Sequence, residues 1–233
     1  MFHQGAYRFD AGPSLLTMPH LIDELFILAG KDPRSAFQYK RKEETCRYFW
    51  NDGSNLTASA DPAKFAEDAG RLFGISPDHI LRKLDNSKLM YEKAGRIFLE
   101  NPLHKLSTWL SRDVLAALPY LHRLGLFSTM HEENDRILKQ AHLVQLFDRF
   151  ATYNGSDPYR APGMLNIIPH FEHQTGVFHP LKGMHQITES LYQLALDLGV
   201  DFHFSEKAIE IVVNQKKATG VKTEKDFYPG ALV

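Results

Sequence analysis

The spacing of apolar residues changes near Asp61, and this change constrains the fold more than any other feature of the sequence. Before Asp61, the stretches FQYKRKEE and CRYFW alternate polar and apolar residues and the turn sequence NDG follows, so residues 37–59 are predicted to form antiparallel strands. From Asp61 to about Phe150 the apolar spacing is helical instead. Two helices are predicted to start at Asp61-Pro62 and at Ser76-Pro77-Asp78. Two more helices are predicted at residues 111–124 and 132–150.

Both ends of the chain mix strands with helices. AYRFDAGPSLLT predicts a strand, and MPHLIDELFILAG predicts a short helix with Leu21, Leu25 and Leu28 on one face and a stop at Gly30. At the far end, GVFHP, a helix closing at Gly199 and the strands VDFHF and AIEIVV predict a βαβ-like unit, with KKATGVKT as a hairpin return. A further strand is predicted to begin at Leu232-Val233.

Composition excludes several classes of function. The 233 residues are 43% hydrophobic, which is enough for a sizeable core without metals or disulfides. Lys plus Arg at 27 against Asp plus Glu at 28 argues against a nucleic-acid partner. The single cysteine, Cys46, excludes an internal disulfide framework, fits a reducing cytoplasm and is predicted to pack in a strand.

Nothing in the sequence predicts a leader or a membrane span, so the expected location is the cytoplasm. Residues Leu103–Phe127 mix Leu, Phe and Trp with Lys and Arg, a composition that suits peripheral contact with the inner face of a membrane. A buried helix pair interrupted by Pro119 explains the same stretch and is the favoured interpretation.

Two clusters of polar residues invite a chemical interpretation. His170, Glu172, His173 and His179 have metal-ligand side chains, but Pro169 and the strand predicted after them do not make a rigid ligand set, so no metal site is predicted. Ser111, Arg112 and Asp113 offer an acid–base pair, and they equally match a helix N-terminus capped by Ser111, which is favoured. No nucleophile elbow or Walker loop supports a hydrolase or a kinase.

The segment YNGSDPYRAPGMLNII combines turn pairs with tyrosines and an apolar run. Asn-Gly and Asp-Pro mark a loop at Tyr153–Tyr159, and with the apolar run it suits the lining of a tunnel for a long hydrocarbon. A packed surface loop accounts for the same residues. From the residues alone, both interpretations stay open.

Three landmarks occur in a characteristic order: FDAGP at 9–13 before the ELF-LAG helix, RFATYNGSDPYRAP at 149–162, and GVFHPLKGM before the helix ending at Gly199 and the strands VDFHF and AIEI. In this order the chain resembles the phytoene dehydrogenase family of flavin-dependent carotenoid desaturases. The segment ATYNGSDPY is more similar to desaturases of the 1-hydroxycarotenoid 3,4-desaturase branch than to those that act on phytoene itself. The family's N-terminal glycine-rich dinucleotide motif is not found, so the chain is interpreted as an internal fragment.

The resemblance implies an α+β (α/β) fold: a partial FAD/NAD(P)-binding domain with an inserted substrate domain of antiparallel sheet plus helices. Residues 1–35 are expected to form the edge of the flavin domain and the link to the substrate domain. Residues 36–175 are expected to form the substrate domain, with strands at 37–59 and a helical cap at 61–150. Residues 176–233 are expected to form the returning part of the flavin domain, which would be truncated in this chain.

The resemblance also implies site residues. The substrate would contact Tyr153, Asn154, Gly155, Tyr159 and Met164, and the cofactor would lie near Gly183, Met184 and Ala208. Asp113 is the candidate catalytic residue, although Ala116 stands where related bacterial desaturases carry an arginine, so an Asp–Arg proton relay is not carried over. Lys182-Gly183 stands where the family usually has two glycines, and Ala208 where it has valine.

The implied reaction is desaturation of a carotenoid by hydride transfer to FAD. This chain alone is expected not to bind FAD and to be inactive, because the phosphate loop lies outside it. The alternatives are an amine-oxidase-like or isomerase flavoenzyme on another apolar substrate, and a non-catalytic module that binds a hydrophobic ligand. The sequence predicts no oligomeric state.

Overall fold

The computed structural model describes residues 1–230. Two compact units divide the chain, one at residues 1–188 and one from Glu189 onward, and their boundary falls within helix α10 (Gln186–Asp197). The strand predicted at Leu232-Val233 lies outside the described residues.

The first unit opens with a hairpin and a helix. Strands β1 (Phe2–Gln4) and β2 (Tyr7–Phe9) pair antiparallel, and helix α1 (His20–Leu28) follows, with Gly30 at a φ of +70° after its end. The predicted strand and helix are confirmed. The apolar face of α1 is not buried, however: Leu28 is 83% exposed, and Phe26 packs inward instead.

Short antiparallel strands lie in the segment between α1 and the first long helix. After the short helix α2 (Pro33–Ala36), strand β3 (Tyr39–Arg41) pairs antiparallel with strand β6 (Phe178–Pro180), and β4 (Glu44–Phe49) pairs antiparallel with β5 (Asn55–Ser59). In the β4–β5 turn, the Ser54 amide donates to Asp52 Oδ1 at 2.9 Å and Gly53 has a φ of +87°. The antiparallel strands expected from polar–apolar alternation are therefore present.

The helices begin where the capping signals place them. Asp61 caps α3 (Pro62–Phe73) by accepting the Ala63 amide at 2.8 Å, and Ser76 caps the long helix α4 (Pro77–Leu99). The helix predicted at 111–124 forms as α6 (Arg112–Ala117) continued by the 3-10 helix η1 (Leu118–Arg123), after the short helix α5 (Leu106–Trp109).

The single helix predicted at residues 132–150 is two helices in the structure. Residues 132–150 were expected to be continuous, but α7 (Met130–Leu138) ends at Lys139, whose φ is +52°, and α8 (Ala141–Asp148) starts anew. The Gln140 side chain accepts the Leu143 amide at 2.8 Å and caps α8. The remaining turns of this unit are η2 (Arg149–Asn154), η3 (Gly163–Ile167), α9 (Ile168–His170) and the π-helical turn η4 (Phe171–Thr175).

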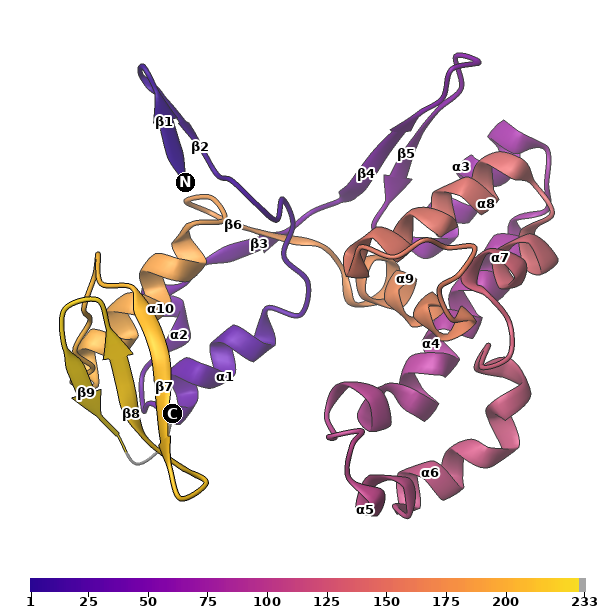
Figure 1. The fold of residues 1–233 in the computed structure, drawn as a ribbon. Helices are drawn as coiled ribbons and strands as arrows, with labels where there is room; N and C mark the ends of the chain where they lie inside the picture. Colours follow the sequence, from indigo (N-terminus) through magenta and orange to yellow (C-terminus); the bar gives the residue numbers. More distant parts are fainter. Residues whose placement is uncertain (231–233) are drawn as a thin grey trace. The chain divides into compact units, whose positions relative to one another are not determined.

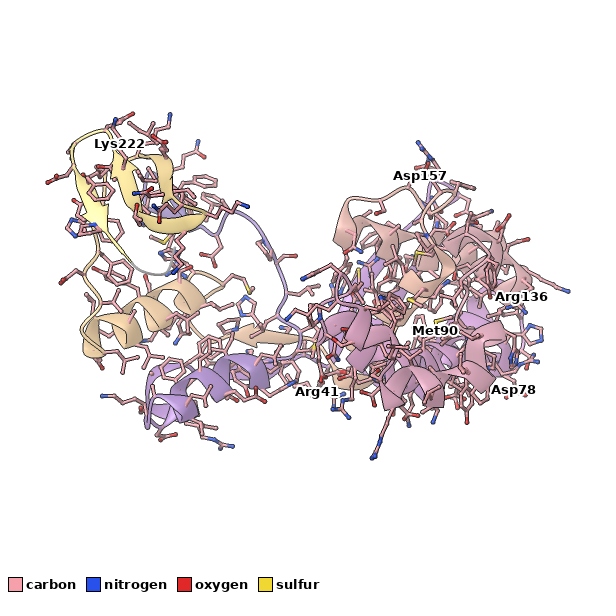
Figure 2. The ribbon with its side chains drawn as sticks, turned by 60° about the horizontal axis from the view of Figure 1, so that its bottom comes forward. Arg41, Asp78, Met90, Arg136, Asp157 and Lys222 are labelled. Carbon is pink, nitrogen blue, oxygen red and sulfur yellow. The ribbon has the colours of Figure 1, made fainter. Side chains whose placement is uncertain are left out.

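The main core lies among these helices. α4 contacts α3, α7, α9 and η3 (Figure 1). With α8 and η2 these helices supply a buried cluster that includes Phe65, Met90, Phe147 and Phe150. Met90 lies inside this group of helices, whereas Asp78 and Arg136 lie at its edge (Figure 2). The helical part of the first unit therefore has a hydrophobic core of its own.

The stretch Leu103–Phe127 differs from the favoured expectation of a buried helix pair. Leu106 and Leu110 are each 76% exposed and Phe127 is 96% exposed, although Leu124 is buried. No helix within residues 1–230 combines the length and apolar character needed to cross a bilayer.

The second unit contains an antiparallel sheet. Strands β7 (Ala208–Asn214), β8 (Lys217–Thr223) and β9 (Phe227–Pro229) lie in that order, and the β7–β8 turn has positive φ at Gln215 and Lys216, as a two-residue hairpin turn requires. The predicted hairpin is confirmed. The strand predicted at VDFHF is wrong: these residues form no strand, and the rings of Phe202 and Phe204 instead lie edge-on and tilted against Tyr192 of α10, with centroids 4.6 and 5.8 Å away.

The described chain thus combines helices with small antiparallel sheets. The expected βαβ-like unit does not form within residues 1–230, since β6 pairs with β3 and β7 pairs with β8.

Candidate functional site

The turn between β6 and α10 is the first part of the candidate site. It contains Gly183 and Met184, both expected near a cofactor. The Asp10 carboxylate accepts the Met184 amide at 2.7 Å, and Arg8 Nη2 donates to the Lys182 carbonyl oxygen at 2.5 Å. Arg8, inside strand β2, and Asp10, just after it, therefore hold this turn, and each lies 174 residues away in sequence from the residue it contacts.

Gly183 fits this contact because it has no side chain. Its φ is +92°, and a Cβ placed there would lie 2.5 Å from Asp10 Oδ2 and 2.7 Å from Arg8 Nη2. Its own amide donates to the Pro180 carbonyl at 3.0 Å. The amides of Gly183 and Met184 are both bonded within the chain, so they are not free to bind a ligand.

The base of this turn is fixed by β3 and by the segment before α1. Leu16 and Phe178 exchange two backbone hydrogen bonds of 3.0 and 2.8 Å. Tyr39 packs edge-on against Phe178 and donates its hydroxyl to Asp23 at 2.6 Å. Burial, with this hydrogen bond, raises the pKa of Tyr39 to about 12. A pocket of about 400 Å³ borders Tyr39 and Asp23.

Ala208, the third residue expected near the cofactor, lies in the second unit. It is the first residue of β7, is exposed and pairs with Thr223 of β8.

The second part of the candidate site surrounds Tyr153, one of the expected substrate contacts. Its hydroxyl donates to Glu172, and Arg149 Nη2 donates to both oxygens of the same carboxylate at 2.9 and 3.2 Å. Glu172 is only 1% exposed, so its charge is balanced by Arg149 rather than by water. Tyr153 is thereby held by a buried ion pair.

The surroundings of this pair favour a charged guanidinium and neutral phenols. Although burial opposes its charge, Tyr48 and Glu172 raise the pKa of Arg149 above its usual range. Burial raises the pKa of Tyr48, and burial together with Glu172 raises that of Tyr153. Neither phenol is therefore available as a base near neutral pH.

His173 lies beside this pair and is kept neutral. Its ring lies tilted against Phe65 with centroids 4.6 Å apart, and neither ring nitrogen has a hydrogen-bond partner among the described residues. Burial, with the charge of Arg149, lowers the pKa of His173 to about 3. Within residues 1–230, no three His, Cys, Asp or Glu side chains come together to hold a metal ion.

The other expected substrate contacts lie in different surroundings. Asn154 and Gly155 are exposed, and Gly155 has a φ of +59° with open space around it. Tyr159 is 63% exposed and its ring lies 4.2 Å from that of His131. Met164 is half-buried against the main core.

Asp113, the candidate catalytic residue, belongs to neither part. It lies in the first turn of α6, which Ser111 caps, and its carboxylate lies 3.8 Å from the Arg96 guanidinium. It contacts none of the other candidate residues by hydrogen bond or ion pair among the described residues.

Sequence reasoning missed Arg8, Asp10, Arg149 and the pair His131–Asp148 as functional candidates. Asp10 and Arg149 lie inside the quoted landmarks FDAGP and RFATYNGSDPY, so those landmarks contained a usable signal. The pairing of His131 with Asp148, 17 residues apart, left no signal in the sequence.

The family is shown by comparison with known proteins. A family model described as flavin containing amine oxidoreductase matches residues 2–228. The chain belongs to this family.

Several curated relatives are carotenoid enzymes. The chain is 42% identical over 229 residues to the 1-hydroxycarotenoid 3,4-desaturase of Flavobacterium sp. (strain P99-3), an alignment that covers 98% of this chain and 46% of that protein. It is 32% identical to the hydroxyneurosporene desaturase of Rhodobacter capsulatus, with 92% and 43% covered, and 28% identical to the 4,4'-diapolycopene oxygenase of Methylomonas sp, with 97% and 46% covered. The chain spans less than half the length of these relatives.

Among solved structures, Rab GDI from Plasmodium falciparum matches with a TM-score of 0.39 and 14% identity, covering 94% of this chain and 48% of that one. This likeness is too weak to define the fold.

Proposed function

We propose that this chain is part of a FAD-dependent carotenoid desaturase, which removes two hydrogens across a C–C bond of a long polyene precursor. The observation that carries the proposal is the hydrogen bond between Asp10 and the Met184 amide. It joins FDAGP to LKGM, the two segments that the resemblance assigns to the flavin side. Membership of the flavin family and the carotenoid activities named for the relatives support the same reaction.

The proposed architecture is a flavin domain with an inserted substrate domain. Residues 1–35 and 176–233 would belong to the former and residues 36–175 to the latter. The antiparallel pairing of β3 with β6 supports an insertion, because the segment between Arg41 and Phe178 leaves and returns at neighbouring positions. Its separate helical core supports the same division.

In this proposal FAD, when bound, accepts the hydride. Gly183, Met184 and Ala208 would lie along the cofactor, with Arg8 and Asp10 holding the turn in place. The conformation of Gly183 supports this role, since a side chain there would displace Asp10. The amides of Gly183 and Met184 already donate to Pro180 and Asp10, so other residues of the protein would have to bind the phosphates of FAD.

Tyr153, Asn154, Gly155, Tyr159 and Met164 are proposed to line the substrate path. The buried Glu172–Arg149 pair supports a fixed position for Tyr153. Asp113 is retained as a candidate, but its surface ion pair with Arg96 argues for a structural role instead.

A cytoplasmic location with peripheral contact on the inner membrane face is also proposed. Exposed apolar side chains at Leu106, Leu110 and Phe127, close in sequence to Lys105 and Arg123, support such contact.

The test is to express the full-length protein that contains this chain in bacteria that accumulate carotenoid precursors, and to analyse the pigments by mass spectrometry. A desaturase lowers the precursor mass by two hydrogens for each step and lengthens the chromophore. An isomerase leaves the mass unchanged, and an amine oxidase releases hydrogen peroxide from amines. A protein without bound flavin and without any product would support the non-catalytic ligand module instead.

A discriminating variant is Asp10→Asn in the same expression system. The amide side chain retains an acceptor oxygen but loses the charge, so a modest loss of product is expected. Asp52→Asn, in the β4–β5 turn, is the matched control and should leave product formation unchanged.

A further inference from the structure

A second polar site lies on α7 and α8, apart from the turn at Gly183. His131 Nδ1 lies 2.7 Å from Asp148 Oδ2, and Asn134 Nδ2 donates to the other carboxylate oxygen at 2.7 Å. Asp148 is buried, at 8% exposure, and its two oxygens are both engaged. The carboxylate therefore fixes the orientation of the imidazole and favours a proton on Nδ1.

The Nε2 atom of the His131 imidazole is open to a ligand. His131 is half-buried, and within residues 1–230 no hydrogen bond engages its Nε2. Because Nδ1 carries the proton in the neutral ring, Nε2 presents a lone pair. The dyad thus holds one acceptor in a fixed position.

The expected substrate loop is tied to this dyad. The His131 amide donates to the Pro158 carbonyl at 3.0 Å, and the Met130 amide donates to the Ala161 carbonyl at 2.9 Å. The Tyr159 ring lies tilted against His131, with 4.2 Å between centroids. Both residues line the same cavity, so a ligand bound there can contact both side chains.

A cavity of about 600 Å³ opens at this point. Its lining includes His131, Asp148, Val144, Thr152 and Tyr159, and most of the lining surface is apolar. Pockets of this size, mostly apolar with a few fixed polar groups, are the usual form of small-molecule sites.

We propose that this cavity binds the hydroxyl-bearing end of an otherwise apolar ligand, with His131 Nε2 as the hydrogen-bond partner of the hydroxyl group. The proposal rests on the proposed desaturase function and names the part of the substrate that the site recognises. An alcohol suits the dyad because it donates to the neutral imidazole and accepts from the protonated one.

The charges around the cavity disfavour the other ligand classes. An anion would face the carboxylates of Asp135 and Asp148, and the only arginine in the lining, Arg149, is paired with Glu172. A cation would seek a carboxylate, but both oxygens of Asp148 are engaged and Asp135 is exposed to water.

The test compares two probes on the purified chain: the isoprenoid alcohol nerolidol and the isoprenoid hydrocarbon farnesene. Isothermal titration should show nerolidol binding about fivefold tighter, the gain expected from one net hydrogen bond. His131→Phe keeps an aromatic ring against Tyr159 and should remove this preference while farnesene binding persists. His142→Phe is the matched control, because His142 has the same 28% side-chain exposure, pairs with Asp52 and does not line the cavity.

Nitrogen NMR of the imidazoles gives a readout that does not depend on the variants folding. Nerolidol should shift the His131 Nε2 resonance of the wild-type chain, and farnesene should not. Equal affinity for the two probes, a preference that survives in His131→Phe, or an unchanged Nε2 resonance would overturn the proposal. These results are independent of the pigment analysis: desaturation without an alcohol preference refutes this site alone, and an alcohol preference without desaturation refutes the proposed reaction alone.

Discussion

Replacing Gly183 with alanine tests whether the Asp10 contact holds the turn before α10. A Cβ at this position would lie 2.5 Å from Asp10 Oδ2, the atom that accepts the Met184 amide. It would also lie 2.7 Å from Arg8 Nη2, which donates to the Lys182 carbonyl. The substitution therefore displaces both side chains, and it imposes the left-handed backbone region on a residue with a Cβ.

The expected loss has two parts. Holding alanine at positive φ costs about 1–2 kcal/mol. Breaking the hydrogen bonds of two exposed side chains costs about 0.5–1.5 kcal/mol more, since solvent competes for such groups. The free energy of unfolding should fall by about 1.5–3.5 kcal/mol in total.

Gly30→Ala is the control, because Gly30 also has positive φ, +70°, but nothing lies within 4 Å of an added Cβ. Urea unfolding followed by tryptophan fluorescence reports on the first unit, which contains both Trp50 and Trp109. Gly183→Ala should lose more stability than Gly30→Ala, and in an Asp10→Ala background the excess should shrink. Equal losses in the two glycine variants would show that the turn is not held by Asp10.

Three further outcomes are expected. Burial lowers the pKa of Lys83 from 10.5 to about 7, so the unfolded chain binds more protons than the folded chain between those values, and the free energy of unfolding should rise with pH by up to about 1.4 kcal/mol per unit. Urea titrations at pH 7 to 9 should show this rise flattened in Lys83→Met, and an equal slope in both proteins would contradict it. The purified chain should show no FAD-dependent increase in Tm, because it has no glycine-rich phosphate loop; a shift in a thermal melt would contradict this. Gly155 has a φ of +59° with open space around it, so Gly155→Trp in the flavin-loaded full-length enzyme should cost about 1–2 kcal/mol of stability but lower carotenoid turnover far more, and turnover that is unchanged, or that falls only in step with Tm, would indicate a structural loop.

The local signals in the sequence predicted much of the fold. Alternation with an Asn-Asp-Gly turn placed β4 and β5, and Asp61 and Ser76 cap the helices that follow them. These features depend on interactions within a few residues, so the sequence contains what is needed to predict them.

Other features depended on distant partners. Helical periodicity identified the Leu21, Leu25 and Leu28 face of α1 but not what lies against it, and Phe26 is the side chain that packs inward. The break at Lys139 had no glycine or proline to announce it, and the Gln140 cap stabilises it instead. Contacts such as Asp10 with Met184 connect opposite ends of the chain, so no local pattern predicts them.

Glu172 and His173 show why neighbours in sequence need not share a chemical role. Both are 1% exposed, within the π-helical turn of residues 171–175, and the sequence reading weighed them together as metal ligands. In the structure Arg149 balances the charge of Glu172 and Tyr153 donates a hydrogen bond to it, whereas burial beside aromatic rings keeps His173 uncharged. A metal would have to replace Arg149 at the carboxylate. The distant Arg149, and not the spacing of histidines, therefore decides what this turn can bind.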